Sequence, residues 1–461
     1  MSQVTLPDVI ETLSRKFQIP GMAGGVFADG QEIYACHGVT SLDNSLPVDQ
    51  DTLFLVASVT KTFTATTLMR LVAEGKVELN APVRRYVPEF RLKDEQAADK
   101  ITVLNLLNHT SGLDWRVNVD TGEGDDALER YVAKMAEMEL IAPLGTRVSY
   151  SQAGYNLLGR IIEKVTGQTF EQAVDALVFE PLGLSHSFFE RDDIMIRRFV
   201  VGHNGGEDGT LSVARPWRHS RGENPGGGLA TSVADLLSFA RFHLGDGRAA
   251  SGEQVLPATI LHQMQEPTAE LRASALGDAI GIGWFLRDVG GVRTVGHAGS
   301  ANGQFAELLL VPERNFAVVS LSNAGPDGIP FNQAVVSFAL ENYLGLVNRD
   351  PEPIPFDAAR AQEIAGTYAN EMMTFTIDTV GDRLRLALRI KPEIRAAAEK
   401  APPPDPAPCE FGLLPSNKDE YIITSGAFKG QRGFFTRDTR GVVVGVDLAG
   451  RLFSRVPTTA G

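Results

Sequence analysis

A proline-rich stretch, Asn348 to Asp357, divides this sequence into two parts with different residue patterns. The stretch reads NRDPEPIPFD and carries three prolines within five residues. Proline fixes its own backbone angle and disfavours helix at the residue before it, so a helix cannot continue through such a segment. We therefore predict a linker over residues 348–357, which joins a first domain, residues 1–347, to a second domain, residues 358–461.

The second part has the pattern of a small β domain. Apolar and polar residues alternate in TFTIDT and RLRLALRI, on either side of Gly381-Asp382, as in a hairpin. Further short strand-like runs follow, around a proline-rich loop from Lys400 to Glu410. About 100 residues of successive short strands predict a small all-β, barrel-like domain.

The first part mixes strands and helices. Strand-like runs lie near its beginning, in AGGVFADG and EIYACHG, and near its end, in VRTVGH, FAELLLVP and NFAVVSLS. Between them, TFTATTLMRLVAEGK and GYNLLGRIIEKVTG place apolar residues on one helical face and stop at glycine. This order predicts an α+β domain, in which distant segments close an antiparallel sheet that is flanked by helices and a helical subdomain.

Charge and composition exclude several classes of function. The net charge is −14, and all of it belongs to residues 1–350, because residues 351–461 carry 14 basic and 14 acidic side chains. Such a chain is not expected to bind nucleic acid or an anionic membrane. No uncharged run exceeds 13 residues, whereas a membrane-spanning helix needs about 18 apolar residues.

The ends and the cysteines add two expectations. The first residues, MSQVTLPDVIETLSRKF, have acids and no apolar core, so they do not resemble a secretory signal, and we expect a cytoplasmic protein. Cys36 and Cys409 cannot build a disulfide scaffold or a zinc ribbon. Motifs for a zinc protease, an EF-hand or a phosphate-binding loop are absent, so we expect no metal and no organic cofactor.

Ser58 and Lys61 form the one motif that suggests chemistry. They stand in Ser-Val-Thr-Lys at the predicted start of a helix, after the apolar run LFLVA. Residues three apart share a helix face, so the amine can reach the hydroxyl. A desolvated lysine can lose its charge and activate a serine nucleophile. The alternative is a helix-capping serine followed by a solvated lysine.

A series of longer segments resembles the serine β-lactamase-like hydrolases closest to class C. This family contains class C β-lactamases, D,D-peptidases, D-aminopeptidases, family VIII esterases and some transacylases. The similar segments follow in family order over residues 15–345 and include LLNHTSGL, YSQAGYNLLGRIIEKVTGQTF, GGGLATSVADLLSFARF and GHAGSANGQFAELLLVPERNFAVVSLSN. The resemblance implies an active site between a mixed sheet and a helical subdomain. The second domain resembles the lipocalin-like domain of some peptidase members, which can lie over the active-site cleft.

The resemblance implies roles for seven residues. Ser58 is the expected nucleophile, Lys61 its base, and Tyr150 a phenol of lowered pKa that relays the proton to the leaving group. His297 and Gly299 belong to the third motif, where the lactamases carry Lys-Thr-Gly, and the backbone N–H groups of Ser58 and Ser300 would form the oxyanion hole. Gln152 replaces the asparagine that contacts the substrate amide in the family. A second literal Tyr-x-Asn motif, Tyr368 to Asn370, lies in the β domain and is rejected; His109 and His186 are interpreted as structural.

The departures from the family pattern favour a peptidase over a β-lactamase. A histidine at position 297 is a poorer permanent counter-ion than lysine for a β-lactam carboxylate, since its reference pKa is about 6.5. We therefore expect hydrolysis of a small peptide or amide, as by a D-aminopeptidase or a related peptidase, through an acyl-enzyme on Ser58. The alternatives are a carboxylesterase, then a β-lactamase or a transacylase, and last a non-catalytic scaffold. A homo-oligomer is compatible with the sequence.

One further hypothesis concerns the substrate's charge. Two acidic loops, Gly122 to Glu129 and Gly205 to Gly209, could attract the free amine of an aminopeptidase substrate. The alternative is that both are solvated surface loops.

Overall fold

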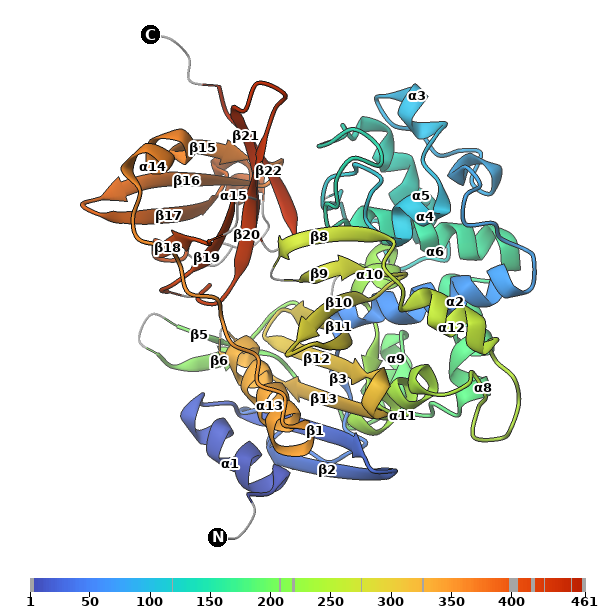
Figure 1. Ribbon diagram of the computed structural model, residues 1–461. Coiled ribbons are helices and arrows are strands. Elements are labelled where there is room, and N and C mark those ends of the chain that lie inside the picture. The colour runs from blue at the N-terminus through green and yellow to red at the C-terminus, as the bar shows by residue number, and fades with distance from the viewer. Residues whose placement is uncertain are drawn as a thin grey trace.

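An eight-stranded antiparallel sheet forms the centre of the first domain (Figure 1). The computed structural model describes residues 4–457 except 118, 207–208, 218–219, 275, 326, 398–404, 416–418, 427 and 449. In sheet order the strands are β2 (Gln31–Gly38), β1 (Gly21–Ala28), β13 (Phe316–Ser322), β12 (Gln304–Val311), β11 (Val292–Ala301), β10 (Phe285–Val289), β9 (Gly277–Ile280) and β8 (Ala269–Ser274). β1 pairs with β13 in the register Val26↔Val318, which confirms that distant segments close the sheet.

Helices cover both faces of this sheet. On one face, α1 (Leu6–Lys16) and α13 (Gly328–Leu344) pack apolar side chains onto β1 and β13. On the other face, α11 (Val233–Leu244) joins the main apolar core. Successive residues of β13, such as Val318 and Val319, point to opposite faces and are both fully buried. The sheet is therefore an internal layer, which explains its nearly continuous apolar sequence.

The helical subdomain is inserted between β2 and β8. Its long helices are α2 (Thr60–Ala73) and α6 (Gln152–Thr166), and both lie in the main core. The shorter ones are α3 (Glu95–Ala98), α4 (Val103–Leu107), α5 (Ala127–Lys134), α7 (Phe170–Val174), α8 (Glu180–Leu182), α9 (Arg191–Met195), α10 (Asn224–Gly227) and α12 (Ala258–Met264). Two small sheets accompany them: β3 (Phe54–Leu55), β7 (Ala230–Thr231) and β4 (Ser187–Phe188); and β14 (Ala324–Gly325), β5 (His203–Gly205) and β6 (Leu211–Val213).

The second domain is a closed eight-stranded antiparallel barrel with up-and-down strand order (Figure 1). Its strands are β15 (Gly366–Ala369), β16 (Met373–Val380), β17 (Arg383–Ile390), β18 (Cys409–Leu413), β19 (Glu420–Ile423), β20 (Arg432–Arg437), β21 (Val443–Leu448) and β22 (Arg451–Arg455). β16 and β17 form the hairpin predicted around Gly381-Asp382. Buried aromatic rings from several strands, among them Tyr368, Phe375 and Phe435, pack together inside the barrel.

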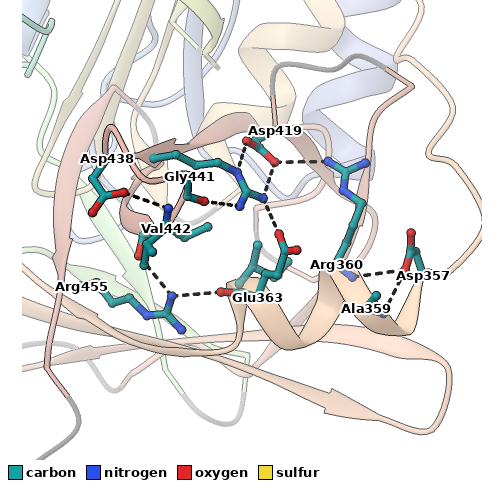
Figure 2. Close-up of polar contacts among 12 residues, drawn as sticks. Asp357, Ala359, Arg360, Glu363, Asp419, Asp438, Gly441, Val442 and Arg455 are labelled. Atoms are coloured by element: carbon teal, nitrogen blue, oxygen red, sulfur yellow. Dashed lines mark hydrogen bonds and ion pairs between the residues drawn. The ribbon is translucent and has the colours of Figure 1, made fainter.

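A charged network fastens a helix to one end of this barrel (Figure 2). α13 ends at Leu344, and after the proline-rich segment α14 (Ala358–Ile364) begins under an N-cap from Asp357. Asp419 accepts hydrogen bonds from Arg360 at 3.4 Å and Arg437 at 2.7 Å. Each such partly exposed ion pair contributes little to the stability of the fold. They occupy the end of the barrel that carries the β20–β21 turn, so the β21–β22 turn lies at the opposite end.

That opposite end of the barrel packs against the first domain. β20 lies beside β8 (Figure 1), and the Arg272 guanidinium covers the Phe434 ring at 4.5 Å. Arg432 of β20 lies 3.9 Å from Asp278 of β9. The barrel therefore packs on the open edge of the main sheet, at β8 and β9.

Candidate active site

Ser58 lies in a tight turn between β3 and α2. The turn is a 3₁₀ helix, Ala57–Val59, and α2 starts at Thr60. Ala57 has a φ of 46°. A non-glycine residue in this region costs of order 1–3 kcal/mol and persists only where the surrounding structure imposes it. The backbone at the predicted nucleophile is therefore held in an unfavourable conformation by its neighbours.

Gly299 of β11 is one of those neighbours. A Cβ atom on Gly299 would lie 2.0 Å from the Val56 carbonyl oxygen and 3.1 Å from the Ser58 nitrogen. Only glycine lets the strand approach the nucleophile's backbone this closely. Ser300 follows on the same strand and is exposed. The oxyanion hole from the N–H groups of Ser58 and Ser300 stays a prediction, for which this close packing is the structural basis.

Lys61 is fully buried and points at Ser58. Its Nζ lies 3.3 Å from Ser58 Oγ, 2.6 Å from Gln152 Oε1 and 2.5 Å from the Gly226 carbonyl oxygen. Burial, reinforced by the positive charge of Arg451, holds the pKa of Lys61 well below its usual range, although Glu223 opposes the effect. A neutral amine has two hydrogens and one lone pair. The two carbonyl-type oxygens can take the hydrogens, which leaves the lone pair for the Ser58 hydroxyl.

Tyr150 is the third residue of this group, but its pKa is not lowered as expected. Its ring centroid lies 4.9 Å from Lys61 Nζ, and its buried hydroxyl has no hydrogen-bond partner within the described residues. Burial raises the pKa of Tyr150, and the nearby Ser58 hydroxyl and Arg451 offset this only in part. The expected lowering was wrong because it considered the neighbouring cation and not desolvation. Tyr150 therefore rests as a neutral phenol, which can donate a proton and be reprotonated.

Gln152 serves Lys61 in this structure. It opens α6 under the N-cap Ser151, and its backbone N–H donates to the Trp115 carbonyl oxygen at 2.6 Å. Its side-chain oxygen accepts from Lys61, while its Nε2 donates to the Glu223 carbonyl oxygen at 3.3 Å. Both ends of the amide are thus occupied within the protein, and a contact with substrate stays a prediction.

His297 is buried on β11 and carries no charge. Burial, reinforced by nearby Lys61, lowers the pKa of His297 to about 3, although a hydrogen bond to Ala298 opposes it. Nδ1 lies 2.8 Å from the Ala298 carbonyl oxygen, which can only accept, so Nδ1 holds the ring proton. His297 lies near Tyr150, with 6.2 Å between ring centroids. A neutral ring there cannot act as the counter-ion of a substrate carboxylate.

The remaining motif residues have structural contacts. His109 accepts the Ser151 N–H on Nδ1 at 3.1 Å, and its ring centroid lies 4.6 Å from that of Tyr150. His186 is half-buried, and its backbone N–H donates to Asp235. Tyr368 lies inside the barrel and donates to the Ile364 carbonyl oxygen at 2.7 Å. The literal Tyr-x-Asn motif is therefore remote from Lys61, whereas Tyr150 is beside it.

Sequence reasoning missed a site residue that comes from the barrel. The β21–β22 turn reaches the first domain, where the Gly450 carbonyl oxygen accepts the Tyr150 N–H at 2.8 Å. The next residue, Arg451, places its guanidinium carbon 4.1 Å from the Trp115 ring centroid. Its Nε is buried without a hydrogen-bond partner within the described residues. The hairpin is visible in the sequence VDLAGRL, but nothing there shows that its turn enters the other domain.

Arg451 therefore places a positive charge beside Tyr150, whereas Arg116 pairs with Glu223 at 3.7 Å. Burial is the main cause that lowers the pKa of Arg451, and Arg116 lowers it further, while Tyr150, Asp114 and Asp447 act in the opposite direction. No carboxylate lies within ion-pair distance of Arg451 in the described part of the chain. A partly buried guanidinium without an ion-pair partner is costly unless an anion binds to it.

The acidic loop before Tyr150 is already neutralised by arginines. Glu123 pairs with Arg191 at 3.0 Å, and Asp125 pairs with Arg221 at 2.8 Å. Asp126 similarly lies 2.7 Å from Arg130. In the second acidic loop, residues 207–208 lie outside the described residues. The paired loop gives no support to a cationic binding site.

The described residues include neither a candidate metal site nor a membrane-spanning helix. No group of histidine, cysteine, aspartate or glutamate side chains among them could hold a metal ion. No described helix is long and apolar enough to cross a membrane.

Comparisons with known proteins identify the family of this chain. Residues 6–334 match the Beta-lactamase family. Penicillin-binding protein 4 of Amycolatopsis lactamdurans is 34% identical over 377 residues, which cover 78% of this chain and 96% of that protein.

Similar solved structures cover one or both domains. SurE has a TM-score of 0.77 at 25% identity, over 98% of both chains, and its structure with D-Leu has 0.75 at 26%, also over 98% of both. A class C β-lactamase from Rhodobacter sphaeroides has a TM-score of 0.60 at 22% identity, over 73% of this chain and 99% of that chain, which shows the fold alone. The chain therefore belongs to the β-lactamase family of serine hydrolases and penicillin-binding proteins, and it carries a C-terminal eight-stranded β-barrel in addition.

Proposed function

We propose that this enzyme cleaves a short peptide or similar amide whose leaving group ends in a free carboxylate. The reaction proceeds through an acyl-enzyme on Ser58. The observation that carries the proposal is the unpaired guanidinium of Arg451 beside Tyr150.

Each catalytic group has one role in this scheme. Lys61 takes the Ser58 proton as Oγ attacks the substrate carbonyl carbon, and the N–H groups of Ser58 and Ser300 bind the oxyanion. Tyr150 gives its proton to the departing amine and is reprotonated from Lys61. The C–N bond breaks, and water or another acceptor then attacks the ester on Ser58.

Arg451 lies on the leaving-group side of this scheme. Tyr150 protonates the leaving group, and Arg451 is next to Tyr150, with the Gly450 carbonyl oxygen bound to the Tyr150 N–H. A carboxylate on the leaving amino acid can therefore reach the guanidinium while its nitrogen meets the phenol. His297 is neutral and cannot bind the carboxylate as a counter-ion, so Arg451 has this role in the scheme.

The same charges disfavour an aminopeptidase. A free substrate amine would meet Arg451 near the nucleophile, while the described acidic side chains of residues 122–129 already pair with arginines. The positive charge of Arg451 favours a substrate with a free C-terminal carboxylate, as in a carboxypeptidase, over one with a free N-terminal amine.

The test uses two substrates that differ in a single group. A short N-acyl peptide ending in D-leucine is compared with the same peptide as its C-terminal amide. D-leucine is chosen because SurE, a structural neighbour, has been solved with D-Leu. We expect a kcat/KM at least about tenfold higher for the free acid. Equal values, or a preference for the amide or for a free N-terminal amine, would refute the proposed substrate class.

A further inference from the structure

Glu171 is a buried carboxylate of the helical subdomain that has no role in the scheme above. It lies on α7, and the residue is 8% exposed. Its Oε1 and Oε2 accept hydrogen bonds from Arg221 at 3.3 Å and 3.0 Å, and Oε1 also accepts one from the Asn224 amide at 2.7 Å. Asn224 is itself buried. A guanidinium that binds both oxygens fixes the orientation of a carboxylate, so Glu171 anchors residues 221 and 224 to α7.

The anchored segment, residues 221–227, supplies backbone oxygens to the active site. It ends in α10, which packs beside α2 and α6. The Gly226 carbonyl oxygen accepts a hydrogen bond from Lys61 Nζ at 2.5 Å. The Glu223 carbonyl oxygen accepts one from Gln152 Nε2 at 3.3 Å, and Gln152 Oε1 in turn accepts from Lys61. The two oxygens that bind the lysine amine therefore both depend on where this segment lies.

The backbone at Gly226 has to be held by its neighbours. Glycine has more conformational freedom than any other residue, and a larger residue does not fit here, because a Cβ would lie 1.9 Å from Gln152 Nε2. Thr64 of α2 fixes one side, since its hydroxyl donates to the Pro225 carbonyl oxygen at 2.7 Å. Asn224 fixes the other side through its side-chain amide. The backbone before Gly226 is thus fastened to two different helices, α2 and α7.

We propose that Glu171 is a positioning residue for Lys61, because it anchors the segment whose Gly226 carbonyl oxygen orients the lysine amine. This inference rests on the acyl-enzyme chemistry of the proposed function and does not depend on the substrate's carboxylate. In the neutral amine, one hydrogen is directed to Gly226 and the other to Gln152, so the lone pair is directed to Ser58. A displaced segment loses this alignment, and removal of the Ser58 proton slows. Glu171 does not itself exchange a proton with these groups.

The experiment compares kcat/KM of the full-length wild-type and variant enzymes for the matched acid and amide substrates. Glu171→Gln keeps the size of the side chain, but its amide nitrogen cannot accept a hydrogen bond from Arg221. We expect kcat/KM to fall about 10- to 100-fold for both substrates, because small misplacements of a catalytic group have effects of this size. The acid-to-amide ratio should stay that of the wild type, since the carboxylate subsite is unchanged. Circular dichroism checks that the variant is folded.

Glu163→Gln is the matched control. Glu163 lies near the end of α6, and its ion pair with Arg160 is 2.9 Å long, with side chains that are 9% and 11% exposed. The side chains of Glu171 and Arg221 are similarly 9% and 12% exposed. In the described part of the chain, Glu163 has no hydrogen bond to residues 221–227. Its replacement should therefore leave kcat/KM within about threefold of the wild-type value.

A double variant separates a positioning role from a purely structural one. If Glu171 acts through Lys61, adding Glu171→Gln to Lys61→Ala should reduce kcat/KM by less than about threefold more, because the effects of residues that serve one step are not additive. Losses that multiply would overturn the inference, as would a wild-type kcat/KM in Glu171→Gln or an equal loss in Glu163→Gln. If Glu171→Gln does not fold, Asn224→Ala replaces it, since the ion pair between Glu171 and Arg221 remains.

Failure of the proposed substrate class would give a different result. The wild-type enzyme would then not prefer the acid, and the inference on Glu171 would still be tested with the amide substrate.

Discussion

Replacing Arg451 by methionine should remove the preference for a carboxylate and leave the chemistry at Ser58 working. Methionine keeps most of the side chain's length and its packing on Trp115 but removes the charge. Removing one partner of a desolvated ion pair costs about 2–5 kcal/mol. Arg451 keeps part of its surface exposed, so the lower half of this range applies. Since 1.4 kcal/mol is tenfold, kcat/KM for the acid should fall about 30- to 300-fold.

The assay for Arg451→Met compares the acid and amide substrates on both enzymes. For the amide, kcat/KM should fall less than about threefold, because the amide makes no ion pair with Arg451. Arg432→Met is the control, since Arg432 is another barrel arginine that faces the first domain, at Asp278. It should leave the acid-to-amide ratio unchanged. If Arg451→Met reduces kcat/KM equally for both substrates, Arg451 stabilises the domain interface and does not recognise a carboxylate.

Three further predictions concern the catalytic group itself. Lys61→Ala and Tyr150→Phe should each reduce kcat at least about 100-fold, with little more loss in the double variant, because both residues serve one proton transfer. A similar loss of kcat in Tyr368→Phe would show that Tyr150 is not the catalytic tyrosine. Gly299→Ala should reduce kcat at least about tenfold, because its Cβ would displace the Ser58 turn, while the circular dichroism spectrum stays that of the folded enzyme. The control is Gly245→Ala, whose Cβ has contacts at 3.5 Å or more and whose kcat should be near that of the wild type. Acylation should need the neutral amine of Lys61, whose folded pKa is lowered, so its rate should hold at neutral pH and fall as the pH drops through that pKa; a rate that grows only towards pH 10.5, the ordinary lysine value, would contradict this.

Much of the fold could be predicted because its signals are local. The proline-rich stretch, the alternation around Gly381-Asp382 and the apolar runs that became β1, β12 and β13 are properties of neighbouring residues. The α+β sheet and the all-β second domain follow from them. The order of the elements predicted only that distant segments close the sheet. The pairing of β1 with β13 was not predicted, because the residues of a strand do not specify its partner.

The site could be predicted only where its parts belong to a motif. Ser58 and Lys61 are three apart on one helical turn, and their 3.3 Å contact is a consequence of that spacing. The pKa of Tyr150 depends on burial by distant segments, so the expected direction was wrong. Arg451 is nearly 400 residues from Ser58 and enters the site through the docking of a second domain. No periodicity or spacing within the barrel reports that contact.

The most direct test of the account is covalent labelling of Ser58. The full-length enzyme is treated with a fluorophosphonate or a penicillin, and its intact mass and tryptic peptides are measured. We expect one adduct per chain on the peptide that contains Ser58, and none in Ser58→Ala, which should keep the wild-type circular dichroism spectrum. An adduct on another residue, or equal labelling of Ser58→Ala, would show that Ser58 is not the nucleophile and would contradict the acyl-enzyme mechanism.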